Sequence, residues 1–357
     1  MANPVKQLQR KSEEYQRLDK ADRRRFWSDG ILNNALYILM VIFIVYTAIK
    51  NKNFLSAGSI ANIVSLVAAS LPMALGIAGC IVLTGTDLSA GRIVGLTACI
   101  SASLLQAVDA ASKMWPNLTP PPVILVLILA MIIGGAIGAF NGFFVAKFKL
   151  HPFIVTLATQ LIIYTLLLLY VKAGENNGMA ISGLDKSYSG FITGSILKIG
   201  GTPIPNYVWI AVICTIVMWF IWNKTTFGKN MFALGANEEA ARVSGVNVFA
   251  TNIMVFALAG AMYAVTGFIE GARVASNTAN TGLNYESDAI AACVIGGVSF
   301  VGGIGKIRGI VIGVLMLRLI FVGLNMIGIN QDLFYIIKGG IILFACALDM
   351  RKYLVKK

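Results

Sequence analysis

Residues able to perform covalent chemistry are few in this chain, and they form no recognised catalytic motif. The sequence has no GxSxG or HExxH pattern, the signatures of a serine nucleophile and of a zinc site. The pairs Gly228-Lys229 and Gly305-Lys306 lack both the following Ser or Thr and the earlier glycine of a phosphate-binding loop. His151 is the only histidine, and it cannot form a zinc or haem site without further ligands. The sequence therefore predicts a protein that is not an enzyme, has no metal or cofactor of its own and does not hydrolyse ATP.

The cysteines also predict packing rather than chemistry. They fall within apolar stretches and show no CxxC spacing, so neither a disulfide framework nor a metal site is expected. The five positions are Cys80, Cys99, Cys214, Cys293 and Cys346.

The composition is that of a membrane protein. Hydrophobic residues make up 57% of the 357 residues and charged residues 13%, whereas a soluble domain carries roughly 25% charged residues. The net charge of +13 would suggest nucleic acid in a soluble chain, but here it is read as a signal of membrane orientation. An all-α polytopic protein in a lipid bilayer is predicted, with no nucleic acid partner.

About ten helices are predicted to cross the membrane, since a span needs about 20 apolar residues. The windows are 31–49, 60–84, 88–107, 122–146, 152–171, 205–223, 250–270, 287–301, 307–327 and 332–349. The eighth window is short and ends in the glycine-rich stretch GGVSFVGGIG. It is either a short span or a broken, re-entrant one.

The distribution of basic residues predicts the orientation. With ten crossings and the N-terminus in the cytoplasm, most of the 29 Lys and Arg residues fall on the cytoplasmic side. Both termini are therefore expected in the cytoplasm, with a basic segment at 1–30 and a basic tail at 351–357 on either side of a single transmembrane domain at 31–350. The loop 224–249 is also placed in the cytoplasm.

Two polar, glycine-containing interruptions are candidate gates on a route through the membrane. Polar backbone at membrane depth is tolerated only where protein or a water-filled cavity covers it. The alternative interpretation is that these segments are tight turns and small-residue packing seams. Asp87 is expected to cap the helix that follows it. The candidate residues are Thr84, Thr86, Asp87 and Ser89 in the first segment, and Ser299 and Phe300 in the second.

Most acidic residues lie near the ends of the predicted spans, whereas Arg318 and Lys338 lie within them. A basic residue within a span faces a cavity or a carboxylate more often than lipid. We therefore expect Arg318 either to form a structural ion pair or to line the route.

A short charged helix is predicted between two spans, in the stretch KNMFALGANEEAARVSGVNV. Asn237 suits the N-cap, Glu238 and Glu239 complement the positive end of the helix dipole, and Gly245 suits the C-terminal turn. So short a helix is unstable by itself in water, so its own protein or a partner must brace it. In a chain with no energy source of its own, this helix is a candidate docking point for another subunit.

Several motifs in order along the chain resemble the sugar permeases in the ribose and galactose branch of the ATP-binding-cassette importers. They are TGTDLSAGR, HPFIVTLATQ, NKTTFGKN, FGKNMFALGANEEAARVSGVNV and ESDAIAACVIGGVSFVGG. The resemblance runs from about residue 31 to the C-terminus, and the long basic segment before Ile31 departs from it.

The resemblance implies a homodimeric permease in the cell membrane of a prokaryote, moving a monosaccharide inward by alternating access. It also implies cassette ATPase subunits that bind ATP on the cytoplasmic side, and a soluble sugar-binding protein outside. Galactose or a methyl galactoside is favoured, and a ribose-type sugar is possible. The ATPase-coupling residues implied by the motif are Asn237, Glu238, Glu239, Ala240, Ala241, Arg242, Ser244 and Gly245.

Other functions are weighed against this one. A branched-chain amino-acid permease of the same transporter class is the nearest alternative. A stand-alone ion-coupled carrier or channel is disfavoured by the docking helix, and a membrane-embedded enzyme is disfavoured by the missing catalytic motifs.

Overall fold

The computed structural model describes residues 35–330 and 332–354. The predicted basic segment 1–30 lies outside these residues, and the predicted tail 351–357 is described only in its backbone and only as far as residue 354. The described helices are α3 (Ala35–Lys50), α4 (Ala57–Val82), α5 (Ala90–Leu104), α6 (Val123–Phe148), α7 (Pro152–Ala173), α8 (Lys186–Thr193), α9 (Tyr207–Lys224), α10 (Thr226–Ala236), α11 (Glu238–Val243), α12 (Val248–Val274), α13 (Tyr285–Ile295), α14 (Ile307–Met326) and α15 (Leu333–Leu354).

Six of the described helices are long and apolar enough to cross a membrane: α4, α6, α7, α9, α12 and α14. Shorter apolar helices lie at Ile38–Lys50, Ala90–Leu104 and Leu333–Phe344. Many large hydrophobic side chains on α3, α6, α7 and α9 are exposed, as expected for helices that face lipid. The chain is therefore a polytopic helical membrane protein.

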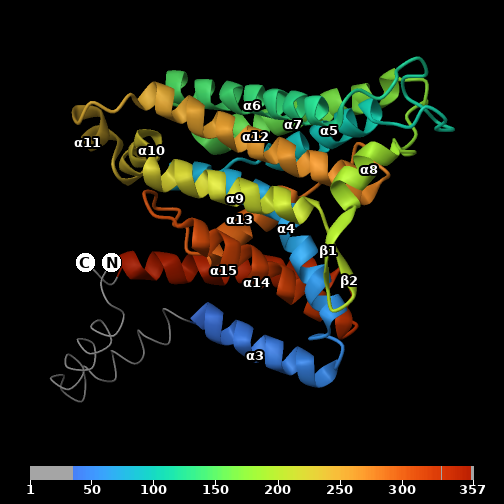
Figure 1. Ribbon diagram of the computed structural model, residues 1–357. Coiled ribbons are helices and arrows are strands. Elements are labelled where there is room, and N and C mark those ends of the chain that lie inside the picture. The colour runs from blue at the N-terminus through green and yellow to red at the C-terminus, as the bar shows by residue number, and fades with distance from the viewer. Residues whose placement is uncertain (1–34, 331, 355–357) are drawn as a thin grey trace.

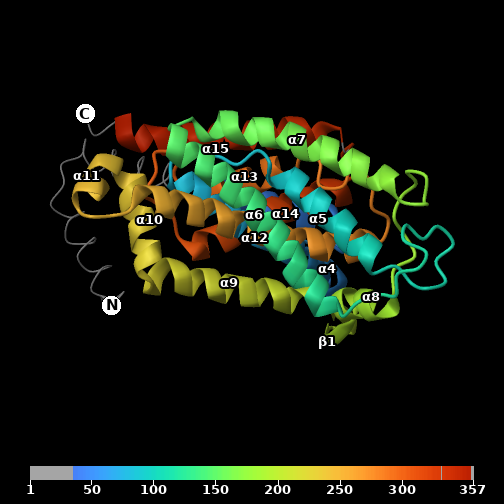
Figure 2. The ribbon, with the colours of Figure 1, turned by 90° about the horizontal axis from the view of Figure 1, so that it is seen from above.

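The long helices run along a common axis and form an elongated bundle (Figures 1 and 2). Helices α10 and α11 lie at one end, where the C-terminal end of α15 also lies, and α8 and the strands lie at the other. We call these the coupling end and the hairpin end.

The only strands in the described residues form a hairpin, which the all-α prediction did not include. Strand β1 (Ser195–Ile199) pairs antiparallel with β2 (Thr202–Pro205). Gly200 and Gly201 connect them with φ values of 53° and 84°, the backbone of a two-residue hairpin turn, for which Gly-Gly is well suited. Nearby, Asp185 caps α8 by accepting hydrogen bonds from the Ser187 amide and hydroxyl, and these bonds lower the pKa of Asp185.

Helix α12 is the centre of the bundle and packs on α4, α5 and α6. Its contact with α6 needs glycine, because the two backbones touch. A Cβ on Gly138 would lie 2.0 Å from the Phe256 carbonyl oxygen, and one on Gly260 would lie 2.0 Å from the Gly134 carbonyl oxygen. Small residues bring membrane helices close enough for van der Waals contact to hold them together.

The predicted window 287–301 corresponds to a broken helix rather than a complete span. Helix α13 has 11 residues and ends before Gly296. Beyond it, Gly297, Gly302 and Gly303 have positive φ values, which glycine adopts without strain. At about 1.5 Å per residue α13 covers only about half of a bilayer core. The window is therefore a broken segment, of which α13 is the helical part.

Candidate functional site

The predicted charged helix is present as α11. The Asn237 side chain accepts a hydrogen bond of 2.9 Å from the Ala240 amide, which confirms the N-cap. Arg242 pairs with Glu238 at 2.7 Å and with Glu239 at 3.5 Å, and Gly245 has a φ of 84°. These local interactions explain why so short a segment forms a helix.

Helix α11 projects from the coupling end and is held by one side only. Ala241 is buried, and the Val246 amide bonds to its carbonyl oxygen. Val243 is 88% exposed. Such exposure is unusual for a branched apolar side chain that lies outside the apolar part of the bundle. Sequence reasoning did not select Val243, although it stands within the motif. The arrangement suits contact with another protein.

The preceding helix, α10, was not predicted, and it connects α11 to the bundle. Its N-cap is Thr225, whose hydroxyl accepts a hydrogen bond from the Gly228 amide at 3.1 Å. Its other end passes directly into Asn237, the cap of α11. The sequence contains a signal for the start of this helix, because Thr225 before TFGKN suits the N-cap position.

The end of α10 meets both predicted gate segments at a junction of backbone contacts. The Gly303 amide donates to the Val82 carbonyl oxygen at 2.9 Å. A Cβ on Gly235 would lie 1.8 Å from the same oxygen, and one on Gly302 would lie 2.3 Å from the Gly235 carbonyl oxygen and from Cγ2 of Thr84. We call Val82, Thr84, Gly235, Gly302 and Gly303 the glycine junction. It brings Thr84 close to the loop that carries Ser299 and Phe300.

Within that loop Ser299 has a turn-forming role. It is buried, its amide donates to the Ile304 carbonyl oxygen at 3.1 Å, and its hydroxyl accepts from the Val301 amide at 3.2 Å. Phe300 is half-buried against the hydrophobic core. The loop is therefore an ordered turn with internal hydrogen bonds.

Asp87 and Ser89 belong to a buried polar chain that continues into α6 and α7. Ser89 donates to Asp87 at 2.6 Å, Asn141 donates to Ser89 at 3.0 Å, and Thr159 donates to Asn141 at 2.6 Å. The expectation that Asp87 caps α5 was wrong, because the N-cap position is Ser89 and no side chain caps that helix end. Asp87 instead stabilises the turn before the helix through the Ser89 amide.

Thr86 takes part in this region through its backbone. Its carbonyl oxygen accepts from the Thr156 hydroxyl at 3.4 Å, and the same hydroxyl accepts from the Leu88 amide at 3.1 Å. Sequence reasoning missed Asn141, Thr156 and Thr159, since single polar residues in apolar helices do not reveal which loop they face.

A cleft lies beside α11, between the start of α12 and the turn from α6 to α7. Lys149, His151, Glu238 and Asn252 line it together with Thr84. His151, the residue before the predicted window 152–171, caps α7 by accepting from the Phe153 amide at 3.3 Å. Within the described residues no group of three or more His, Cys, Asp or Glu is placed to hold a metal ion.

Arg318 lies away from the glycine junction, among α4, α13 and α14. Its guanidinium group is 3.7 Å from the Asp288 carboxylate and donates to the Ser70 hydroxyl at 3.2 Å. It also lines a small cavity. The ion pair of the first alternative is present, and a place on the route stays a prediction.

Comparison with known proteins identifies the family. Residues 59–346 match the model of the family described as branched-chain amino acid transport system / permease component. The chain is 44% identical over 323 residues to the galactose/methyl galactoside import permease protein MglC of Salmonella typhimurium strain LT2, covering 90% of this chain and 95% of the relative. It is 33% identical over 334 residues to the ribose import permease protein RbsC of Bacillus subtilis strain 168, covering 93% and 98%. No solved structure matches the chain.

These matches cover both the glycine junction and α11, and they agree with the transport role expected from the motifs. Membership implies an ATPase and a binding protein as partners, and it makes the chain a transport subunit rather than an enzyme. The chain belongs to the permease components of ATP-binding-cassette importers, in the branch that contains the galactose and ribose permeases.

Proposed function

We propose that this permease imports a monosaccharide, galactose or a methyl galactoside, into the cytoplasm of a bacterium. The observation that carries the proposal is the 44% identity over 90% of the chain to permeases named for these sugars. The lower identity of 33% to a ribose permease makes ribose the second sugar to test. The name of the matching family keeps a branched-chain amino acid as the competing substrate.

The transmembrane domain, residues 31–350, makes ten crossings, counting the short helices α3, α5 and α15 and the broken helix α13. With the coupling end in the cytoplasm, Lys147, Lys149, Lys224 and Lys229 lie on the side that positive residues prefer. The loop 224–249 then faces the cytoplasm, where ATP is available.

Helix α11 is the coupling helix that docks on a partner ATPase. The predicted residues on its surface are Asn237, Glu238, Glu239, Ala240, Arg242, Ser244 and Gly245, with Val243 exposed beside them and Ala241 as the contact to the bundle. Closure of the ATPase pair moves α11 and α10 as one piece, because Asn237 caps one helix and ends the other. The glycine junction passes this movement to the end of α4 and to the loop before α14, the two proposed gate segments.

Two copies of the chain enclose the route, and a soluble sugar-binding protein delivers the sugar at the hairpin end. ATP is bound by the ATPase subunits alone. Alternating access then follows from the different affinity of the ATPases for ATP in the two states of the permease.

Uptake of labelled substrates tests the proposed function. A bacterial strain that lacks its own transporters for the tested sugars should express this chain with its ATPase and binding protein. We expect ATP-dependent uptake of galactose or methyl galactoside that exceeds uptake of ribose and leucine. Uptake of leucine alone would show that the substrate is a branched-chain amino acid and not a sugar. Uptake without the ATPase would contradict the coupling mechanism.

Charge reversal tests the coupling helix. The double variant Glu238→Lys and Glu239→Lys opposes the helix dipole and changes the docking charge, so sugar uptake and sugar-stimulated ATP hydrolysis should fall together. Glu175→Lys is the control for ATPase binding, which it should leave unchanged, because Glu175 is exposed in the loop after α7, at the hairpin end. Normal uptake by the double variant at normal expression would contradict the coupling role.

Cysteine labelling tests the orientation. A cysteine at Ala240 should react with an impermeant reagent only from the cytoplasmic side, and the bound ATPase should slow the reaction. A cysteine at Ile196, which is 84% exposed in the hairpin, should react only from outside. The reverse pattern would overturn the topology.

A further inference from the structure

Helix α13 begins halfway along the bundle rather than at one of its ends. The segment 275–284, which joins α12 to α13, lies against α5. Arg92 in α5 donates to the Ala279 carbonyl oxygen at 3.1 Å, and a Cβ on Gly91 would lie 2.5 Å from the Gly282 carbonyl oxygen. The chain therefore returns into the bundle as irregular backbone before α13 starts. Such backbone occurs at membrane depth where it is buried in protein or lines a water-filled cavity.

The first turn of α13 carries Asp288, which holds two cations. Its carboxylate pairs with Arg318 near the middle of α14 and with the ammonium group of Lys338 in α15. Side-chain exposure is 16% for Asp288, 19% for Arg318 and 12% for Lys338. Charges near the centre of a membrane are costly and mark substrate pathways more often than packing.

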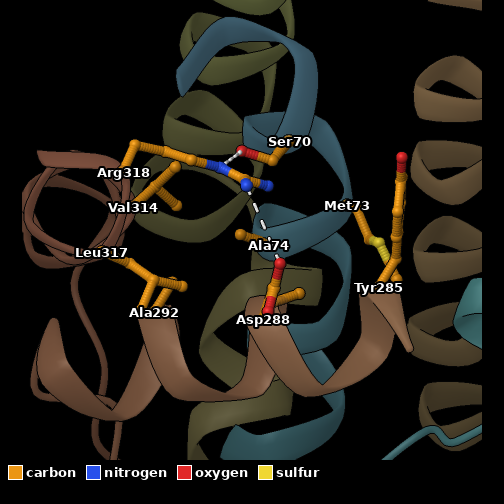
Figure 3. A pocket seen from close by; sticks show the side chains of 10 residues that line it. Ser70, Met73, Ala74, Tyr285, Asp288, Ala292, Val314, Leu317 and Arg318 are labelled. Carbon is orange, nitrogen blue, oxygen red and sulfur yellow. Dashed lines mark hydrogen bonds and ion pairs between the residues drawn. The ribbon is translucent and has the colours of Figure 1, made fainter. Parts of the chain in front are cut away.

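Asp288 and Arg318 line a narrow cavity, together with Ser70, Tyr285 and apolar side chains (Figure 3). Arg318 crosses the cavity between Ser70 on α4 and Asp288 on α13, while Tyr285 stands at the start of α13. The cavity holds about one water molecule, so a sugar fits only when the surrounding helices separate. Broken helices at mid-membrane depth with polar groups at their ends are a common form of transporter binding site.

The groups in this cavity suit a neutral solute rich in hydroxyls. A carboxylate accepts hydrogen bonds from two neighbouring hydroxyls, a guanidinium group donates from its planar fork, and a serine hydroxyl does both. A small cation is disfavoured because Arg318 and Lys338 already neutralise Asp288. Tyr285 donates to Glu270 at 3.3 Å, which fixes its ring beside the cavity as an apolar surface for the C–H face of a sugar.

We propose that Ser70, Asp288 and Arg318 form the contact site for the hydroxyl groups of the transported monosaccharide, halfway along the route, with Tyr285 as one wall. The site rests on the proposed sugar import and adds its place in the membrane. When the helices separate, sugar hydroxyls replace the bond between Ser70 and Arg318 and the long contact between Arg318 and Asp288. The closer pair of Asp288 and Lys338 holds the carboxylate in place.

Protection of an introduced cysteine tests the site in the complete importer. Ser70→Cys should react with a hydrophilic, impermeant thiol reagent, and galactose should slow the reaction several-fold while an equal concentration of glycine betaine leaves it unchanged. Leu161→Cys is the control, because Leu161 is 63% exposed on the outer face of α7, where lipid excludes the reagent. The unsubstituted chain, with its native cysteines, sets the background. Failure to react, or reaction that galactose does not slow, would overturn the contact site.

A second variant keeps the test decisive if Ser70→Cys does not fold. Arg318→Lys retains the positive charge but loses the planar fork that matches two acceptors. This variant should change the ratio of galactose to ribose uptake several-fold. If the ion pair were purely structural, its loss would lower both uptake rates equally, in proportion to the amount of folded protein. An unchanged ratio would overturn the contact site even where the wild-type chain imports galactose, so this failure is distinct from failure of the proposed function.

Discussion

Gly235 and Gly303 lie against one another at the glycine junction, so close that a Cβ on Gly235 would stand 2.9 Å from the Gly303 amide nitrogen and 1.8 Å from the Val82 carbonyl oxygen. Gly235 precedes the coupling helix by only a few residues, and Gly303 follows the broken helix α13. In the proposed mechanism, the junction therefore links the end of α10 to both proposed gate segments.

Substitution of Gly235 by alanine should weaken this path. The added methyl group forces the end of α10 away from Val82, at a cost of about 1–3 kcal/mol of folding free energy, and uptake should fall more than the amount of folded protein. Gly190→Ala is the control, since outside its chain neighbours and its own helix backbone no atom lies within 4 Å of a Cβ there. Thermal unfolding and uptake of the two variants provide the comparison, and equal uptake would remove the junction from the coupling path.

Val243 should contribute to the affinity for the ATPase. Full burial of this exposed valine against the ATPase would contribute about 2 kcal/mol, so Val243→Asp should weaken ATPase binding roughly thirtyfold. The control Ile196→Asp places the same charge on an exposed apolar residue of the hairpin and should leave ATPase binding unchanged. Binding of the purified ATPase to each variant in lipid nanodiscs measures the difference. Equal affinity for the two variants would show that Val243 is an inert part of the surface.

Thr159 should stabilise the α6–α7 contact through the buried polar chain. Thr159→Ala leaves Asn141 with an unpaired buried oxygen, at a cost of about 1–3 kcal/mol. Thr165→Ala in the same helix removes only an exposed bond to its own backbone and should change stability by less than about 0.5 kcal/mol. Equal melting temperatures for the two variants would show that the chain adds nothing to stability.

The ion pair of Glu270 and Arg273 should matter more than that of Glu238 and Arg242. The Glu270 side chain is 3% exposed, so Arg273→Met leaves a buried charge and should cost about 3–5 kcal/mol. The exposed Arg242→Ala should cost at most about 1 kcal/mol. Adding Glu270→Gln to Arg273→Met should restore part of the loss, because the unpaired charge is gone. A thermal unfolding series on the four proteins measures these differences.

Local rules were sufficient to predict the coupling helix and most of the long helices. The cap at Asn237 and the turn at Gly245 depend on residues a few positions apart, and long apolar segments identify themselves by composition. The interior placement of Arg318 followed from the cost of a charge in lipid. None of these conclusions needed knowledge of which helices are neighbours.

Contacts between distant segments could not be predicted in this way. Nothing local indicates that Gly235 meets Val82, that Asn141 meets Ser89, or that Arg318 finds its carboxylate in Asp288. The wrong expectation for Asp87 has the same origin, because its surroundings depend on the packing of α4 and α5. The sequence by itself determined a helical membrane protein with a short capped helix between two spans, since these follow from hydropathy and neighbouring residues. The glycine junction and the cavity at Arg318 were decided only by the tertiary structure, because they exist only where helices far apart in the chain pack together.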